Sequence, residues 1–119
     1  MYRPPNANSQ LFIEKYVAYL NSVGKNEIYL IGDFNFDLSK KQNSDVGKFI
    51  DTNSCFGLLH LITNPTRLNH RNSSILDNFL TNDINRNKNS YILIDDTTDH
   101  LAILCIVKFG TKQCYRNRK

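Results

Sequence analysis

The segment 32–37 (GDFNFD) combines a carboxylate and a carboxamide at the end of a short apolar run. If the backbone stays extended there, Asp33 and Asn35 project to the same side, because side chains along a strand alternate with a period of two. Such a pair could position a nucleophilic water. The alternative is a polar turn that leaves a strand, since Gly, Asp and Asn all favour turns.

A second polar segment, 98–101 (TDHL), stands where the last apolar run begins. The imidazole of His100 can donate a hydrogen bond to a phosphate oxygen, and the carboxylate of Asp99 can hold a hard cation. The alternative is a turn at the entry to a strand, with a partly exposed histidine.

Asp77 interrupts the apolar pattern of the segment 73–82. A buried carboxylate is costly unless it is paired or hydrogen-bonded, so Asp77 requires a partner, and His100 is the obvious candidate. Otherwise Asp77 faces solvent on an edge strand. Near the N-terminus, Tyr2 precedes a rigid Pro-Pro turn that could hold its hydroxyl in one place, although such a tyrosine often only packs.

These segments are separated by alternating helical and strand patterns. A helix is expected from Asn8 or Ser9 to about Val23, with Gly24 as its stop, because apolar residues recur there at helical spacing. The other expected elements are a buried strand at 27–32, a helix at 45–53, and strands at 58–62, 74–81, 91–94 and 101–109. This order predicts an α/β sheet architecture.

Composition narrows the class of protein. A chain of 119 residues with 40% hydrophobic and 22% charged residues is one globular domain at most. The formal net charge of +4 favours polyanionic partners such as nucleic acid. Much of the excess lies in an exposed basic tail, and a solvated tail is the more usual explanation of such a run; its basic residues are Lys108, Lys112, Arg116, Arg118 and Lys119. The three cysteines form no CxxC pair, so a zinc site is not expected. The longest apolar run, 101–107, is too short to span a membrane, so we expect a soluble intracellular protein.

Taken in order, the motifs Y-x-P-P, G-D-F-N-x-D, L-D-N-F-L and T-D-H resemble the endonuclease/exonuclease/phosphatase superfamily. The similarity is greatest to the apurinic-type endonuclease domain of non-LTR retrotransposons, and the segment 64–67 (NPTR) fits the same pattern. The resemblance covers nearly the whole chain, from Tyr2 to about Phe109.

The resemblance implies an incomplete four-layer α/β sandwich. Residues 1–110 would form its C-terminal half, a mixed sheet with helices on one face, and residues 111–119 would be a basic tail. It implies metal-dependent phosphodiester hydrolysis on DNA, with Mg²⁺ or Mn²⁺ as the cation. If the chain is functional, it would act in the nucleus.

The resemblance also implies roles for individual residues. Asp33 would orient or deprotonate the attacking water, and Asn35 would help to align it. Tyr2 would donate a hydrogen bond to the phosphate. His100 would contact the scissile phosphate, with its ring oriented by Asp77.

The metal ligand implied in the same way is Asp99. Complete members of the family have a longer first half, which supplies an early asparagine and a glutamate that binds the metal. The glutamates here, Glu14 and Glu27, do not match that ligand.

We therefore expect weakened cation binding, little or no nuclease activity from this chain alone, and self-association through an exposed sheet face. Two alternatives stay open. One is a phosphatase or phosphodiesterase on the same fold, and the other is a non-catalytic retrotransposon remnant or nucleic-acid-binding module.

Overall fold

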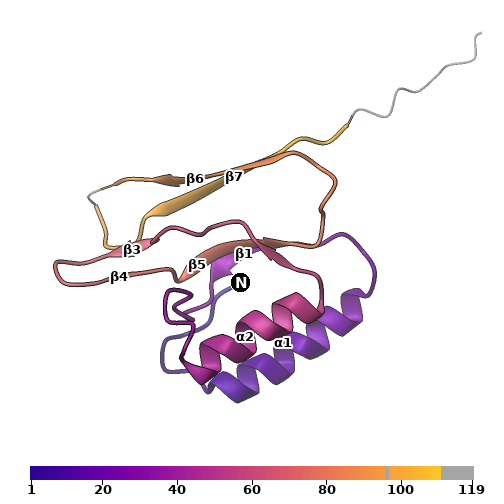
Figure 1. Ribbon diagram of the computed structural model, residues 1–119, viewed down its shortest axis with the longest axis horizontal. Coiled ribbons are helices and arrows are strands. Elements are labelled where there is room, and N and C mark those ends of the chain that lie inside the picture. The colour runs from indigo at the N-terminus through magenta and orange to yellow at the C-terminus, as the bar shows by residue number, and fades with distance from the viewer. Residues whose placement is uncertain (96, 111–119) are drawn as a thin grey trace, which may run out of the picture.

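The computed structural model describes residues 1–95 and 97–110. The elements form three layers, with two helices below a central sheet and a long β-hairpin above it (Figure 1). The helices cover one face of the central sheet, as predicted. Among the described residues, neither helix combines the length and apolarity that crossing a membrane requires.

Both helices begin at asparagine caps. Helix α1 (Ser9–Val23) follows Asn8, whose side chain accepts a hydrogen bond from the backbone N–H of Leu11 at 2.9 Å. Helix α2 (Ser44–Cys55) follows Asn43, which caps the first turn in the same way. Such caps satisfy backbone donors that have no partner within the helix. Gly24 ends α1 at a φ of 65°, a conformation that glycine adopts without steric cost.

The central sheet has the strand order β1-β5-β2, and all its strand pairs are antiparallel. Strand β1 (Tyr29–Asp33) pairs along its whole length with β5 (Asp77–Thr81), and the short β2 (Leu59–His60) lies on the other side of β5. The predicted mixed sheet is therefore wrong for the named strands. Within the described residues, the one parallel contact is an isolated bridge between Tyr2 and Asp33.

Two further hairpins complete the described structure. Strands β3 (Arg67–Leu68) and β4 (Ser73–Ser74) form a small one, and β6 (Lys88–Leu93) and β7 (Ala102–Val107) form the upper layer. The strand predicted at 74–81 is thus divided. Its break has a local cause, because the Asp37 carboxylate accepts a hydrogen bond from the Ile75 N–H, and the Thr66 hydroxyl accepts one from the Leu76 N–H.

An aromatic core joins the helices to the sheet. The Phe49 ring of α2 is 1% exposed and stacks on Phe36, with ring centroids 4.6 Å apart. Phe34, at the end of β1, packs against the same ring at 5.3 Å. Tyr16 of α1 is also buried, and its hydroxyl donates to the Asn53 side chain at 2.8 Å, so the two helices are joined by a satisfied polar contact.

The N-terminal segment runs beside the end of β1. The Asp33 N–H donates to the Met1 carbonyl at 3.1 Å, and the Arg3 N–H donates to the Asp33 carbonyl at 2.9 Å. A side chain at position 32 could not fit, because a Cβ on Gly32 would lie 1.8 Å from the Met1 carbonyl oxygen. Glycine therefore permits the close approach that places residues 1–3 next to Asp33.

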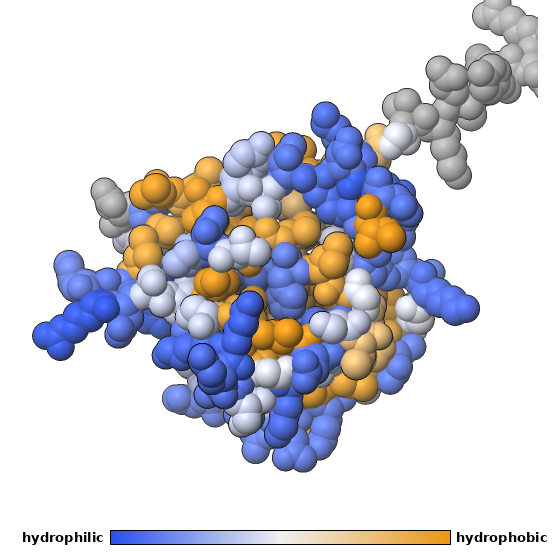
Figure 2. Space-filling view, viewed as in Figure 1, coloured by the Kyte–Doolittle hydropathy of each residue, from blue (hydrophilic) through white to orange (hydrophobic). Residues whose placement is uncertain are grey.

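The β6–β7 hairpin carries apolar side chains on its outer face. Opposite pairs in the register bring Tyr91 beside Leu104 and Leu93 beside Ala102, and Ile106 continues the same face. Tyr91, Leu93, Leu104 and Ile106 are each between 43% and 49% exposed. Hydrophobic residues are accordingly visible at the surface in the upper part of the molecule (Figure 2). The predicted exposure of an apolar sheet face is confirmed for this hairpin.

Truncation of Phe49 to alanine should destabilise the fold by about 3–5 kcal/mol, because it removes the ring that three aromatic neighbours contact. Denaturant unfolding would measure the difference. Leu11→Ala, at an exposed position on α1, is the matched control and should change stability by no more than ~0.5 kcal/mol. Equal effects of the two substitutions would contradict the assignment of the core.

Candidate metal centre

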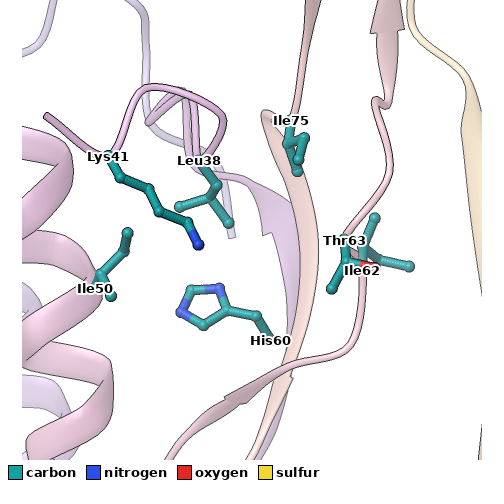
Figure 3. Close-up of a pocket in the computed structure, with 7 residues that line it drawn as sticks. All are labelled: Leu38, Lys41, Ile50, His60, Ile62, Thr63 and Ile75. Atoms are coloured by element: carbon teal, nitrogen blue, oxygen red, sulfur yellow. The ribbon is translucent and has the colours of Figure 1, made fainter. Parts of the chain in front are cut away.

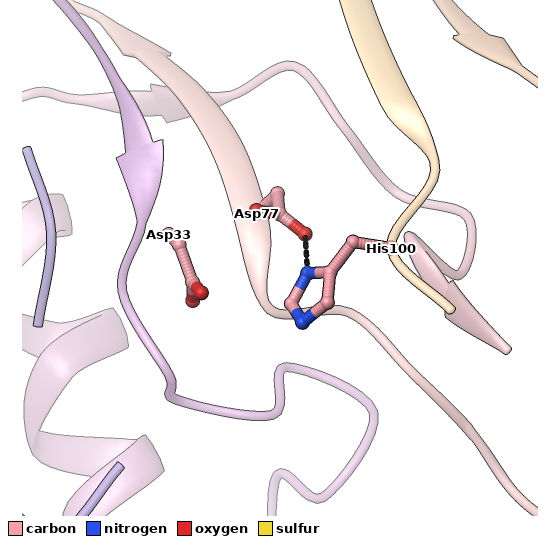
Figure 4. A group of neighbouring side chains, drawn as sticks. All are labelled: Asp33, Asp77 and His100. Atoms are coloured by element: carbon pink, nitrogen blue, oxygen red, sulfur yellow. Dashed lines mark hydrogen bonds and ion pairs between the residues drawn. The ribbon is translucent and has the colours of Figure 1, made fainter. Parts of the chain in front are cut away.

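Three potential metal ligands gather at one end of the central sheet. Asp33, Asp77 and His100 each offer a ligand atom, and these atoms all lie within 4.8 Å of one another (Figure 4). The antiparallel register places Asp33 at the end of β1 directly opposite Asp77 at the start of β5. His100 reaches the same place from the segment before β7, which forms an isolated bridge with Arg67.

The predicted contact between His100 and Asp77 is confirmed. The Nδ1 atom of His100 lies 3.2 Å from Oδ2 of Asp77, and the two side chains are 37% and 18% exposed. If the Nδ1–H donates to this carboxylate, the other ring nitrogen is left free for a phosphate or a cation. Figure 4 shows that second nitrogen pointing away from Asp77.

The electrostatic environment of Asp33 disfavours its charged form. Partial burial raises the pKa of the Asp33 carboxyl, and the negative charge of Asp77 raises it further. The hydrogen bond from the Asn35 N–H and the nearby His100 and Arg67 act in the opposite direction. The carboxylates of Asp33 and Asp77 offer hard oxygen ligands of the kind that Mg²⁺ or Mn²⁺ prefers, and such a cation would offset the repulsion between them.

Asn35 does not continue the strand. The extended backbone ends at Asp33, and Asn35 has a φ of 48°, in the left-handed region that asparagine tolerates better than most residues. The condition for Asp33 and Asn35 to share one side, an extended backbone, is therefore not met, and the alternative of a polar turn that leaves the strand is confirmed. They are joined instead by a tight turn, in which the Asn35 N–H donates to Oδ1 of Asp33 at 3.0 Å.

Asp99 lies outside the three-residue cluster, in contrast to its prediction as the metal ligand. Its carboxylate accepts a hydrogen bond from Nε of Arg67 at 2.8 Å, and both side chains are more than 40% exposed. This contact lowers the pKa of the Asp99 carboxyl. Asp99 lies outside the cluster because its backbone is paired with strand β3. The Leu68 N–H donates to the Asp99 carbonyl and holds Asp99 there.

Tyr2 lies beside Asp33 through the parallel bridge, so it reaches the same edge of the sheet as the cluster. It is 64% exposed. The interpretation of Tyr2 as a packing residue is therefore not supported.

Thr66 positions the cluster, although the sequence indicated this residue only as part of the NPTR segment at 64–67. It is fully buried, and its hydroxyl oxygen accepts hydrogen bonds from the N–H groups of Leu76 and Asp77, both at 3.1 Å. Its carbonyl accepts a hydrogen bond from the Leu101 N–H. One residue thus holds both the start of β5 and the segment that carries His100.

One cavity has a volume of about 290 Å³ and a polar lining that includes Asn35, Arg67 and Ser74. A second pocket of about 200 Å³ lies beside helix α2 and is lined mainly by Leu38, Ile50, Ile62 and Ile75 (Figure 3). None of the cluster residues lines this second pocket. None of the cluster residues lines the polar cavity either.

Replacement of Asp33 by asparagine should raise the midpoint of thermal unfolding at pH 7 without metal. The raised pKa of Asp33 means that its ionised form destabilises the folded chain at every pH above the folded-state pKa. The difference between the two midpoints should disappear as the pH falls below the ordinary carboxyl pKa of 3.8, because Asp33 is then protonated in both the folded and the unfolded chain. Thermal melts across this range would measure it.

Glu14→Gln, at an exposed position in the middle of α1, is the matched control and should leave the midpoint unchanged. A lower midpoint for Asp33→Asn at pH 7 would contradict the unfavourable environment assigned to this carboxylate.

The fold was compared with known proteins. No protein-family model and no curated protein matches the chain. A solved structure of the endonuclease domain of TRAS1, a telomere-specific non-LTR retrotransposon, is similar with a TM-score of 0.77 and 16% sequence identity. The match covers 92% of this chain and 56% of the TRAS1 chain. The resemblance predicted from motif order is therefore confirmed at the level of the fold: the chain has the fold of part of the TRAS1 endonuclease domain.

Proposed function

We propose that this chain contributes a divalent-cation site for the hydrolysis of phosphodiester bonds in DNA, in an endonuclease of the non-LTR retrotransposon type. The observation that carries the proposal is the cluster of Asp33, Asp77 and His100 at one end of the sheet. The similarity to the TRAS1 endonuclease domain supports the substrate. Activity on chromosomal DNA would require the protein in the nucleus.

Each side chain has a defined task in this proposal. Asp33 and Asp77 supply carboxylate oxygens for the cation, and the bound cation would offset negative charge on the phosphoryl oxygens. Asp33 also orients the attacking water, together with Asn35. His100 donates to the scissile phosphate while Asp77 holds its ring, and the exposed Tyr2 hydroxyl reaches a phosphate oxygen. Asp99 is left out of the ligand set because Arg67 occupies its carboxylate.

Cation affinity and activity should both be low in this chain by itself. Affinity for hard cations depends on the number and charge of the oxygen ligands, and the cluster offers two carboxylates. The chain also spans little more than half of the TRAS1 domain that it matches, at 56%. Further ligands from the rest of such a domain would be needed for full activity.

Titration calorimetry with Mn²⁺ should show weak binding, with a dissociation constant on the order of 10⁻⁴ M or weaker. Asp33→Ala and Asp77→Ala should each reduce the affinity by at least about tenfold, roughly 1.4 kcal/mol. Glu14→Ala, outside the cluster, should bind as the wild type does. Unchanged binding in both aspartate variants would remove the basis of the proposal.

Plasmid nicking in the presence of Mg²⁺ or Mn²⁺ should be slow or undetectable. The reason is the incomplete ligand set, and agarose-gel separation of nicked from supercoiled plasmid provides the measurement. Robust nicking that Asp33→Ala abolishes would show that the chain suffices for catalysis and would contradict the prediction of weak activity.

The apolar outer face of the β6–β7 hairpin supports self-association. Within the described residues these strands pair only with each other, and a two-stranded hairpin gains stability when a further layer or strand covers it. Exposed apolar patches of this kind are typical of interfaces.

Light scattering after size-exclusion chromatography should detect oligomers of the wild-type chain. Leu104→Lys should shift the population towards monomer, because it places a charge in the centre of the apolar face. Leu11→Lys, at an exposed apolar position on α1, is the control. A monomeric wild type at all accessible concentrations would exclude this interface.

A further inference from the structure

The guanidinium group of Arg3 is buried although it forms no salt bridge within the described residues. Arg3 is 4% exposed, and its charge lies over the Phe36 ring at 4.1 Å from the centroid. Its Nε atom is buried without a hydrogen-bond partner in that part of the chain. Burial of an unpaired charge is costly, so a purely structural role would be served better by an apolar residue of similar size.

The contacts of Arg3 fall into two groups. On the helix side, Nη2 donates to the Ala7 carbonyl at 3.0 Å and to the Ser9 hydroxyl at 2.8 Å. On the side of the metal centre, Nη1 donates to the Asn35 carbonyl at 2.9 Å. The planar guanidinium thus connects the start of α1 with the turn that follows β1.

The backbone of Arg3 holds the same turn from its other side. Its N–H donates to the Asp33 carbonyl at 2.9 Å, and its carbonyl accepts a hydrogen bond from the Asn35 side-chain amide at 2.6 Å. Asn35 is therefore held at both its backbone and its side chain. These contacts stabilise its left-handed conformation, which otherwise costs energy for a residue other than glycine.

This conformation determines where the Asn35 N–H points. It donates to Oδ1 of Asp33 at 3.0 Å, and so restricts the rotation of a carboxylate that belongs to the candidate metal centre. A continuous series of hydrogen bonds therefore runs from Arg3 through Asn35 to Asp33.

We infer that Arg3 is a positioning residue for the Asp33 carboxylate: it holds the turn at Asn35, and the Asn35 N–H in turn orients Asp33 for the cation. The Arg3 side chain acts through Asn35, whereas its backbone N–H contacts the Asp33 carbonyl directly. The functional meaning of this role rests on the proposed metal site, whereas the hydrogen-bond relay is a property of the chain without any ligand.

Amide hydrogen exchange measured by NMR on the metal-free chain tests the relay directly. In Arg3→Lys and Arg3→Met, the Asn35 amide should exchange at least tenfold faster than in the wild type, because its turn is released. The Gly24 amide, which donates to the Leu20 carbonyl at the end of α1, should keep its rate. Ser9→Ala is the matched control, since it removes a contact of the same guanidinium on the helix side and should leave the Asn35 amide protected.

Arg3→Lys keeps the test decisive if Arg3→Met does not fold. It retains the charge and most of the length of the side chain while losing the two-pronged geometry of the guanidinium. Full protection of the Asn35 amide in the folded Arg3→Lys variant would overturn the inference.

The affinity for Mn²⁺ then tests whether the hydrogen-bond relay from Arg3 affects the proposed metal site. Arg3→Lys should weaken Mn²⁺ binding by about tenfold, as loss of an outer-shell partner of a metal ligand does, and Ser9→Ala should not. If the wild type binds no Mn²⁺, the proposed metal site fails, and the exchange rates still decide the role of Arg3. If Arg3→Lys releases the Asn35 amide and binds Mn²⁺ as tightly as the wild type, the positioning role is wrong.

Discussion

The antiparallel register between β1 and β5 is the constraint on which the candidate site depends. It places Asp33 directly opposite Asp77, at the end of one strand and the start of the other. Because side chains along a strand alternate between faces, a slip of one residue would turn one of these carboxylates to the opposite face of the sheet. The buried Leu30 and Leu80 oppose each other in the same ladder, so burial of the apolar residues and alignment of the two aspartates are enforced together.

The register brings two negative charges together, and the structure supports that arrangement from both sides. On the side of β5, the buried Thr66 hydroxyl holds the N–H groups of Leu76 and Asp77. On the side of β1, Arg3 and Asn35 form a turn whose backbone N–H contacts Asp33. Most of these supporting atoms are buried or half-buried. The side chains that would meet a phosphate are more accessible, since Tyr2 is exposed and His100 is half-buried. Rigid support behind accessible groups is the arrangement that preorganised catalysis requires.

The upper layer is joined to the central sheet through a charged side chain, Arg86. Its guanidinium forms ion pairs with Glu27 and Asp83 and lies 4.7 Å from the Phe109 ring centroid. The outer face of the β6–β7 hairpin remains apolar and exposed. The helix side of the molecule therefore has a closed aromatic core, whereas the hairpin side exposes an apolar surface.

The sequence by itself determined the two helices, the strand before Asp33 and the pairing of Asp77 with His100. Helical periodicity with asparagine caps, an uninterrupted apolar run and a lone carboxylate in an apolar strand are local patterns, and local patterns can be read along the chain. The order of the motifs also indicated the superfamily fold. Tertiary structure alone decided the left-handed turn at Asn35, the contact of Asp99 with Arg67 and the buried position of Arg3. Each of these depends on a partner about 30 residues away, and such contacts are set by how strands align in space, which spacing along the chain does not specify.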